Sequence, residues 1–238
     1  MQIRSRTHES VFCARPTEHP YQVSSWSEMK DYYDPNDVIR AAAMMVSVAD
    51  EFKGNNNFEY DLVDIVRQAI AEKGRLTEKV VEAAFAAGDK KLYKDASDRF
   101  LRLILLQDEL LATRPEFKVG TWIARARSLG GTPEEKELYE WNARVQITTW
   151  GNRLAADEGG LRDYAHREWN GILKDFYYMR WKTWFDYQTR LLDGRKTAAI
   201  DFYAIEERWT KATNVYSSEP EGYCISTVKR IFVEIFGK

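Results

Sequence analysis

Apolar residues recur at intervals of three and four positions through most of this 238-residue chain. That interval places them along one side of an α-helix, and no convincing run of the alternating pattern typical of strands is present. Gly and Pro separate the periodic segments, so the connections between them are short. The sequence therefore predicts an all-α fold, a helical bundle of roughly eight helices joined by short loops.

Two helix starts are marked clearly. Asp34 precedes Pro35, and Thr132 precedes Pro133 and two glutamates, which is the pattern of an N-cap followed by proline at the first helical position. The predicted helices cover residues 35–52, 58–73 with a continuation over 76–87, 90–113, 115–129, 133–150, 163–187, 197–213 and 222–236.

The first 34 residues differ from the rest because they show no steady period. Pro16 and Pro20 disfavour a helix in this segment. We therefore expect residues 1–34 to form a lead-in that packs on the surface of the bundle, and residues 35–238 to form one all-α domain.

The charge balance limits the classes of partner. The 35 basic and 37 acidic residues give a net charge of −2, which supplies no broad positive field for nucleic acid or an anionic membrane. No apolar run reaches about 18 residues, and the start of the chain lacks a hydrophobic signal core. As written, the chain is expected to be soluble and without an export signal, although it also fits the middle of a longer protein with a Met added.

Cysteine usage and the absence of known motifs argue against a metal or cofactor. Cys13 and Cys224 are the only cysteines and stand at opposite ends of the chain. Two free thiols are the simpler interpretation, and one disulfide stays open if the ends meet. The spacing of the two cysteines does not fit a zinc site. The sequence contains no phosphate-binding glycine loop and no metalloprotease motif, so neither a nucleotide cofactor nor metal catalysis is expected.

The segment from Tyr139 to Tyr187 is the most distinctive, because it combines aromatic and hydrogen-bonding side chains. Aromatic faces beside a few fixed polar groups suit a sugar ring, which has apolar faces and a rim of hydroxyls. Helical spacing predicts that most of its tryptophans are core residues, and leaves Trp150 between core and site. The five tryptophans of the segment are Trp141, Trp150, Trp169, Trp181 and Trp184.

Four blocks stand in a fixed order along the chain: DLVDIVRQAI, LLQDELLATRPEFKVGTWIARARS, YEWNARVQITTWG and LRDYAHREWNGILKDFYYMRW. In order and spacing they closely resemble the C-terminal helical domain of the α-N-acetylglucosaminidases, glycoside hydrolase family 89. The early stretch from Cys13 through Trp26 to Val38 is similar to the segment leading into that domain. The resemblance covers essentially the whole chain.

The resemblance implies a retaining glycoside hydrolase that removes terminal α-linked N-acetylglucosamine from glycans. In the family the two catalytic glutamates lie on a barrel domain outside this region, and a retaining mechanism needs its two carboxyl groups about 5–5.5 Å apart. Adjacent acids such as Asp108 and Glu109, or Asp157 and Glu158, point in different directions on a helix and do not form such a pair. We therefore expect this chain to hold no catalytic residue, to be inactive alone, and to complete the sugar pocket against the barrel.

The implied partners are an N-acetylglucosamine-terminated glycan and the catalytic barrel of the same protein. We expect the isolated domain to expose an apolar and aromatic face through which it can self-associate. The family resemblance implies a secreted, periplasmic or lysosomal parent. The alternative is a freestanding, non-catalytic helical module that binds a carbohydrate or a protein.

Carried over residue by residue, the family's Trp-Gly element falls on Trp150-Gly151 and its Asp-Tyr-Ala element on Asp163-Tyr164-Ala165. The resemblance implies that the sugar is contacted by Trp150, Tyr164 and Leu161. It implies a supporting or barrel-facing role for Arg144, Asn142, Gln146, Gly151 and Asp163. Two departures from the family pattern are a longer loop, residues 152–160, and Met179 in place of a common proline.

Overall fold

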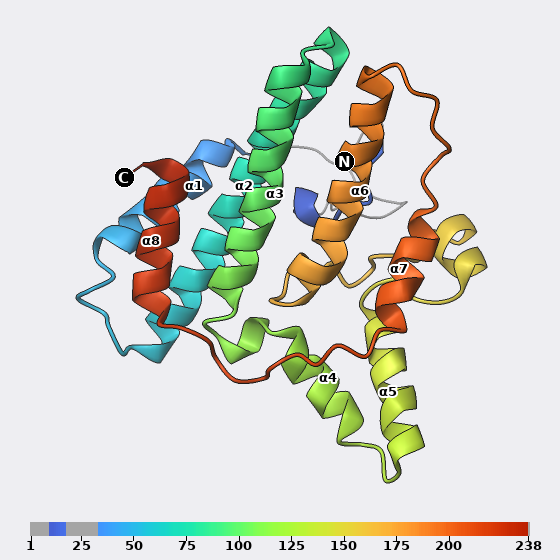
Figure 1. Cartoon of the computed structure of the whole chain (residues 1–238). Coiled ribbons are helices and arrows are strands. Elements are labelled where there is room, and N and C mark those ends of the chain that lie inside the picture. Colours follow the sequence, from blue (N-terminus) through green and yellow to red (C-terminus); the bar gives the residue numbers. More distant parts are fainter. Residues whose placement is uncertain (1–9, 18–32, 238) are drawn as a thin grey trace, which may run out of the picture.

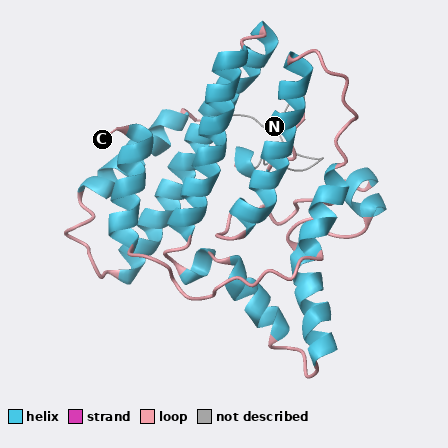
Figure 2. Cartoon of the chain, viewed as in Figure 1, coloured by secondary structure: helices cyan, strands magenta, loops and turns pink. Residues whose placement is uncertain are grey.

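The computed structural model describes residues 10–17 and 33–237. Within these ranges the chain forms eight α-helices and no strand, with only an isolated bridge between Lys118 and Asn170, so the all-α prediction is confirmed (Figure 2). The helices are α1 (Pro35–Ser47), α2 (Asn56–Ala87), α3 (Lys90–Leu111), α4 (Val119–Arg127), α5 (Pro133–Gln146), α6 (Tyr178–Leu192), α7 (Phe202–Thr210) and α8 (Cys224–Phe236).

Helices α2 and α3 form a long antiparallel pair at the centre of the bundle (Figure 1). Helices α1 and α8 pack on one side of this pair, and α6 packs on the other side against α3. Helices α4 and α5 form a hairpin at one end, and α7 contacts both α5 and α6. None of the described helices is long and apolar enough to cross a membrane.

Both predicted N-caps are confirmed. The Asp34 carboxylate accepts a hydrogen bond from the Asn36 amide at 2.9 Å, with Pro35 at the first helical position of α1. Thr132 and Glu135 form a reciprocal capping box at the start of α5. Because these caps satisfy amide groups that the helix itself leaves unbonded, local sequence is enough to locate them.

Helix α2 runs without interruption through Gly74, where the sequence predicts a pause. A Cβ atom at Gly74 would lie 2.5 Å from the Phe12 ring, so the missing side chain makes room for that ring. Phe12 belongs to a short 3₁₀ turn, Val11–Cys13, whose side chains are all buried. Gly74 is therefore a site of close approach between two segments rather than a helix break.

The predicted helix over residues 163–187 is wrong in its first third. The regular turns begin with a π-helical turn, Leu173–Tyr177, and continue as α6. Before them the backbone is irregular, because Asp163 has a φ of 59° and His166 a φ of 45°, and the Asn170 backbone bonds to Phe117 and Val119. Long-range contacts override the apolar period in this segment.

Four other helices are clearly shorter than predicted. Helix α1 ends at Ser47, residues 115–129 divide into a 3₁₀ turn and α4, and α7 begins only at Phe202. Helix α5 ends at Gln146 rather than near Trp150, whose φ of 61° is incompatible with a continuing helix.

Most of the predicted lead-in, residues 1–9 and 18–32, lies outside the described residues, so the boundary at residue 34 stays a prediction. The described part, residues 10–17, inserts Val11, Phe12 and Cys13 into the core. Cys13 and Cys224 are both free and buried. Burial raises the pKa of each thiol, that of Cys224 to about 11.

Candidate functional site

Trp150 and Tyr164 form an aromatic pair on the surface. Their ring centroids lie 5.2 Å apart with the planes inclined by 43°. Both side chains remain accessible, Trp150 with 42% and Tyr164 with 57% of its surface exposed. The structure thus brings together two residues that the sequence separates by a 13-residue connection.

The left-handed backbone at Trp150 places its ring outside the end of α5. The Trp150 amide donates a hydrogen bond to the Val145 carbonyl at 2.8 Å, closing the helix just before the chain turns. Gly151 follows, and its carbonyl accepts a hydrogen bond from the Tyr203 hydroxyl at 3.4 Å. A non-glycine residue at positive φ is uncommon and must be held by its surroundings, so the exposure of Trp150 is built into the backbone.

The loop between the two rings is ordered by its own hydrogen bonds. It contains a π-helical turn, Leu154–Glu158, and the Leu161 amide donates a hydrogen bond to the Ala155 carbonyl at 3.1 Å. Leu161 itself is half-buried. The longer loop noted in the sequence is therefore a folded element, and Leu161 lies at its end, three residues before Tyr164.

Asp163, the residue directly before Tyr164, is held in place by buried hydrogen bonds. Its side chain is fully buried, and both carboxylate oxygens accept hydrogen bonds from Arg180 Nη2 at 2.9 Å. Its amide donates to the Thr148 carbonyl at 2.7 Å, which ties the loop back to the end of α5. Burial raises the pKa of Asp163 to about 6, although the adjacent Arg180 charge lowers it.

The other three predicted residues lie elsewhere. Arg144 is fully buried, donates to Glu140 Oε1 at 2.6 Å and to the Asn214 carbonyl at 2.8 Å, and stacks over the Trp209 ring. It joins α5 to the segment after α7. Asn142 and Gln146 are exposed and line a separate groove of about 420 Å³ beside α4. The structure thus gathers Trp150, Gly151, Leu161, Asp163 and Tyr164, but not these three residues.

The remaining tryptophans of the segment are mostly core residues, as predicted. Trp181 and Trp184 are buried, and Trp169 is half-buried. Trp141 is the exception, since 44% of its surface is exposed on α5. Because Trp141 and Trp150 are exposed to a similar extent, Trp141 can serve as a control for substitutions of Trp150.

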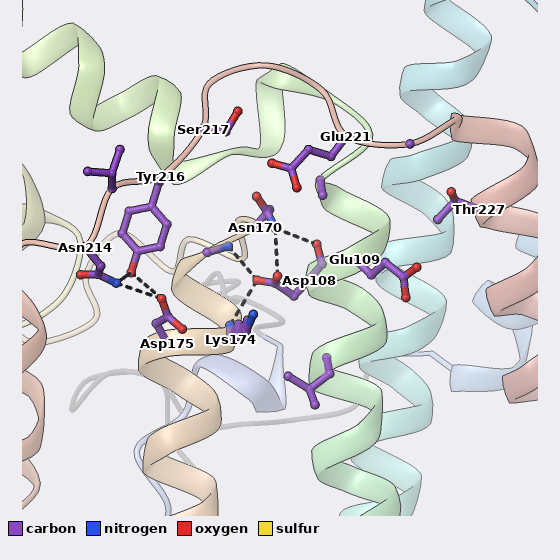
Figure 3. A pocket seen from close by; sticks show the side chains of 15 residues that line it. Asp108, Glu109, Asn170, Lys174, Asp175, Asn214, Tyr216, Ser217, Glu221 and Thr227 are labelled. Atoms are coloured by element: carbon purple, nitrogen blue, oxygen red, sulfur yellow. Dashed lines mark hydrogen bonds between the residues drawn. The ribbon is translucent and has the colours of Figure 1, made fainter.

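A polar groove of about 710 Å³ lies between α3, the start of the α6 segment and the connection after α7 (Figure 3). Asp108 accepts hydrogen bonds there from the Gly171 amide at 2.7 Å and from Asn170 Nδ2 at 2.9 Å. The Tyr216 hydroxyl donates to Asp175 at 2.8 Å, and Lys118 donates to Glu221 at 2.7 Å. These carboxylates all bind groups of the protein itself, so we interpret their hydrogen bonds as stabilising the fold.

The acidic pair Asp108 and Glu109 does not form a facing pair of carboxyls. Asp108 binds the Gly171 region, whereas Glu109 pairs with Arg230 of α8. Adjacent helical residues point in different directions, and their partners differ accordingly.

Asp108 predicts a measurable pH dependence of stability. Burial raises its pKa from 3.8 to about 6, so the folded chain binds this proton more tightly than the unfolded chain. Its contribution to the free energy of unfolding therefore falls as the pH rises from about 4 to about 6. Asp108→Asn should remove this contribution, because an amide does not titrate in this range.

The measurement is urea unfolding of the wild type and of Asp108→Asn at about pH 4 and about pH 7. From about pH 4 to about pH 7, the free energy of unfolding of the wild type should fall by more than that of the variant. Asp163 titrates in the same direction in both proteins, so its effect cancels in the comparison. If the free energies of unfolding of the two proteins change equally with pH, Asp108 does not have the raised pKa that burial gives it here.

Arg180 is one of the polar residues of the distinctive aromatic segment, but the sequence does not predict that it meets Arg15 and Glu206 beneath the loop. The only signal is weak: Arg180 lies in a segment that is apolar on nearly every side, where a charge needs a buried partner. Nothing in the sequence names Glu206 or Arg15 as part of the same cluster, since they lie 191 residues apart.

Comparison with known proteins identifies the family of the chain. Residues 1–234 match the family model of the α-N-acetylglucosaminidase (NAGLU) C-terminal domain. Human α-N-acetylglucosaminidase is 26% identical over 215 residues, which cover 86% of this chain and 28% of that protein.

Solved structures agree with the family match. A family 89 glycoside hydrolase from Clostridium perfringens, in complex with PUGNAc, superposes with a TM-score of 0.91 at 35% identity and covers 96% of this chain. A Clostridium perfringens family 89 enzyme in complex with its substrate GlcNAc-α-1,4-galactose superposes with a TM-score of 0.90. The chain spans 28% of the human relative and 27% of the first of these structures. It belongs to the family of α-N-acetylglucosaminidase C-terminal domains.

Proposed function

We propose that this chain completes the sugar pocket of a retaining α-N-acetylglucosaminidase that hydrolyses terminal α-linked N-acetylglucosamine from glycans. The catalytic carboxyl pair comes from a barrel domain against which this domain packs. The observation that carries the proposal is the exposed pair of Trp150 and Tyr164, held by a left-handed backbone and a buried ion pair. Together with Leu161 we call this pair the sugar wall.

The sugar wall has the composition that a sugar site requires. Two aromatic faces can cover the apolar C–H surface of a pyranose, and the Tyr164 hydroxyl can bond to its rim. The relatives support the same class of ligand, because one is named as an α-N-acetylglucosaminidase and another is in complex with GlcNAc-α-1,4-galactose. Leu161 adds an aliphatic contact at the edge.

The domain also exposes apolar side chains outside the sugar wall. They support the inferred packing against a barrel, and self-association of the domain when it is alone. Those with the largest exposure on the α4–α5 hairpin and the loop are Leu129, Leu138 and Leu154.

Trp150→Ala in the complete enzyme should lower kcat/KM about tenfold to a hundredfold, because one stacking ring contributes roughly 1.5–3 kcal/mol of apolar contact. The melting temperature should change little, since the ring is already largely exposed. The measurement is hydrolysis of a chromogenic aryl α-N-acetylglucosaminide, with thermal unfolding of the same preparations. Trp141→Ala is the matched control, because its ring is exposed to the same extent but lies away from the wall.

Four results would decide the proposal. Equal activity of Trp150→Ala and Trp141→Ala would remove Trp150 from the pocket, and a large loss of stability would assign it to the core. Hydrolysis by the 238-residue chain alone would place a catalytic pair within these helices. Glycan binding without turnover in the complete enzyme would favour a non-catalytic binding module.

A further inference from the structure

A chain of buried charges runs beneath the sugar wall and extends beyond the ion pair of Asp163 and Arg180. Arg180 Nη2 also lies 2.8 Å from Glu206 Oε1 of α7, and neither side chain is exposed. Three fully buried charges therefore meet at one point. Each loses the hydration it would have in water, so their mutual contacts must hold them in a fixed arrangement.

Arg15 continues this chain from the opposite end of the sequence. Its guanidinium binds Glu206 with two hydrogen bonds, Nε to Oε1 at 2.8 Å and Nη2 to Oε2 at 2.5 Å. The remaining Nη1 donates to Asp157 Oδ1 at 2.7 Å. Asp157 lies in the π-helical turn of the loop, so Arg15 ties α7 to the loop that precedes Leu161 and Tyr164.

Two carboxylates of the segment between Trp150 and Tyr164 are therefore each held by an arginine. One is Asp163, immediately before Tyr164, and the other is Asp157, four residues before Leu161. Arg180 binds the first and Arg15 binds the second, while Glu206 lies between the two arginines and forms an ion pair with each. A planar guanidinium with several fixed donors suits such bridging, whereas an ammonium group does not reproduce it.

The backbone that carries Arg15 is itself anchored. The Cys13 carbonyl accepts a hydrogen bond from Arg180 Nη1 at 3.2 Å, and the Phe12 carbonyl accepts one from Trp181 Nε1 at 3.1 Å. Phe12 and Cys13 are fully buried against the bundle. Arg15 therefore projects from a rigid base, and its contacts transmit that rigidity to the loop.

We propose that Arg15 and Glu206 are positioning residues of the sugar wall, which hold Leu161 and Tyr164 in register by bridging Arg180 to Asp157. The inference rests on the function proposed for that wall. Neither residue contacts the sugar. Their effect on turnover passes through the loop that they hold.

Two variants test this role. Arg15→Lys keeps the charge but loses the two-bond contact to Glu206, and Glu206→Gln keeps the shape but removes the buried charge. Hydrogen exchange in the 238-residue chain should become at least tenfold faster for residues 148–166, whose reporters are the amides of Leu161 and Asp163. Exchange in α2 and α3 should stay unchanged.

The same variants in the complete enzyme should lower kcat/KM for the aryl α-N-acetylglucosaminide about tenfold to a hundredfold, because small displacements of positioning groups cost this much. Arg114→Lys is the matched control. Arg114 is buried to a similar extent as Arg15, with 8% and 11% of the side chains exposed, and it binds Glu116 through two hydrogen bonds, but it lies in the turn after α3. It should leave both the exchange of residues 148–166 and the turnover unchanged.

The failures are distinguishable. Unchanged exchange of residues 148–166 in Arg15→Lys and Glu206→Gln, or equally faster exchange throughout the chain, would overturn the positioning role. Loss of turnover in Trp150→Ala with normal turnover in Arg15→Lys would also overturn it, while the proposed wall would stand. Faster exchange of the loop combined with normal turnover in Trp150→Ala would instead refute the function of the wall.

Discussion

Arg180→Met is expected to lower the free energy of unfolding by about 3–5 kcal/mol, because it removes one member of a buried ion cluster and leaves its partners uncompensated. Asp163 and Glu206 are both fully buried beside Arg180, so neither carboxylate regains water when the guanidinium is lost. Methionine fills much of the volume of the aliphatic stem, which separates the loss of charge from a simple cavity. The measurement is chemical unfolding of the 238-residue chain near neutral pH.

Arg102→Met provides the comparison. Arg102 also binds a carboxylate through two hydrogen bonds, to Glu234, but half of its side chain is exposed. An exposed pair contributes at most about 1 kcal/mol, so this variant should remain close to the wild type. Similar losses for Arg180→Met and Arg102→Met would mean that the buried cluster is not what stabilises the base of the loop.

Gly171→Ala should cost about 2–5 kcal/mol, the sum of a strained backbone and an overpacked contact. Gly171 has a φ of 93°, and a Cβ atom there would lie 2.7 Å from the Tyr216 ring and 2.8 Å from a Val119 methyl group. The Gly171 amide donates to Asp108, so this backbone cannot move away without losing a buried hydrogen bond. Urea unfolding of the chain measures the loss.

Gly88→Ala separates the two contributions. Gly88 ends α2 with a φ of 69°, but nothing lies within 4 Å of the added Cβ atom. This variant should show only the backbone cost of about 1–2 kcal/mol. If Gly171→Ala costs no more than Gly88→Ala, the contact with Tyr216 is soft and the connection after α7 can shift.

Local chemistry made much of the fold predictable. A cap such as Asp34 or Thr132 bonds to an amide only two or three residues away, so both partners of the hydrogen bond can be identified from a short stretch of sequence. Apolar periodicity likewise identified α2, α3 and α8, whose contacts lie along one helix face. The prediction at Gly74 shows the limit, because the reason for that glycine is the Phe12 ring, 62 residues earlier in the chain.

The candidate site was predicted only in part, and the family resemblance was needed for it. The resemblance selected Trp150, Leu161 and Tyr164, but periodicity alone placed residues 163–171 in a helix. A continuous helix would have placed Asp163 about 25 Å along its axis from Arg180, too far for an ion pair. The left-handed backbone at Asp163 and His166 results from contacts made by the rest of the molecule.

Local sequence was enough for the all-α class, the capped helix starts and the aromatic character of the segment from Tyr139 to Tyr187, because each depends on residues within a few positions of one another. The pairing of Trp150 with Tyr164 and the contact of Arg15 with Glu206 beneath their loop follow from the folded arrangement of the chain. The physical reason is that buried charges require partners from any part of the chain, and no local pattern specifies which segments will supply them.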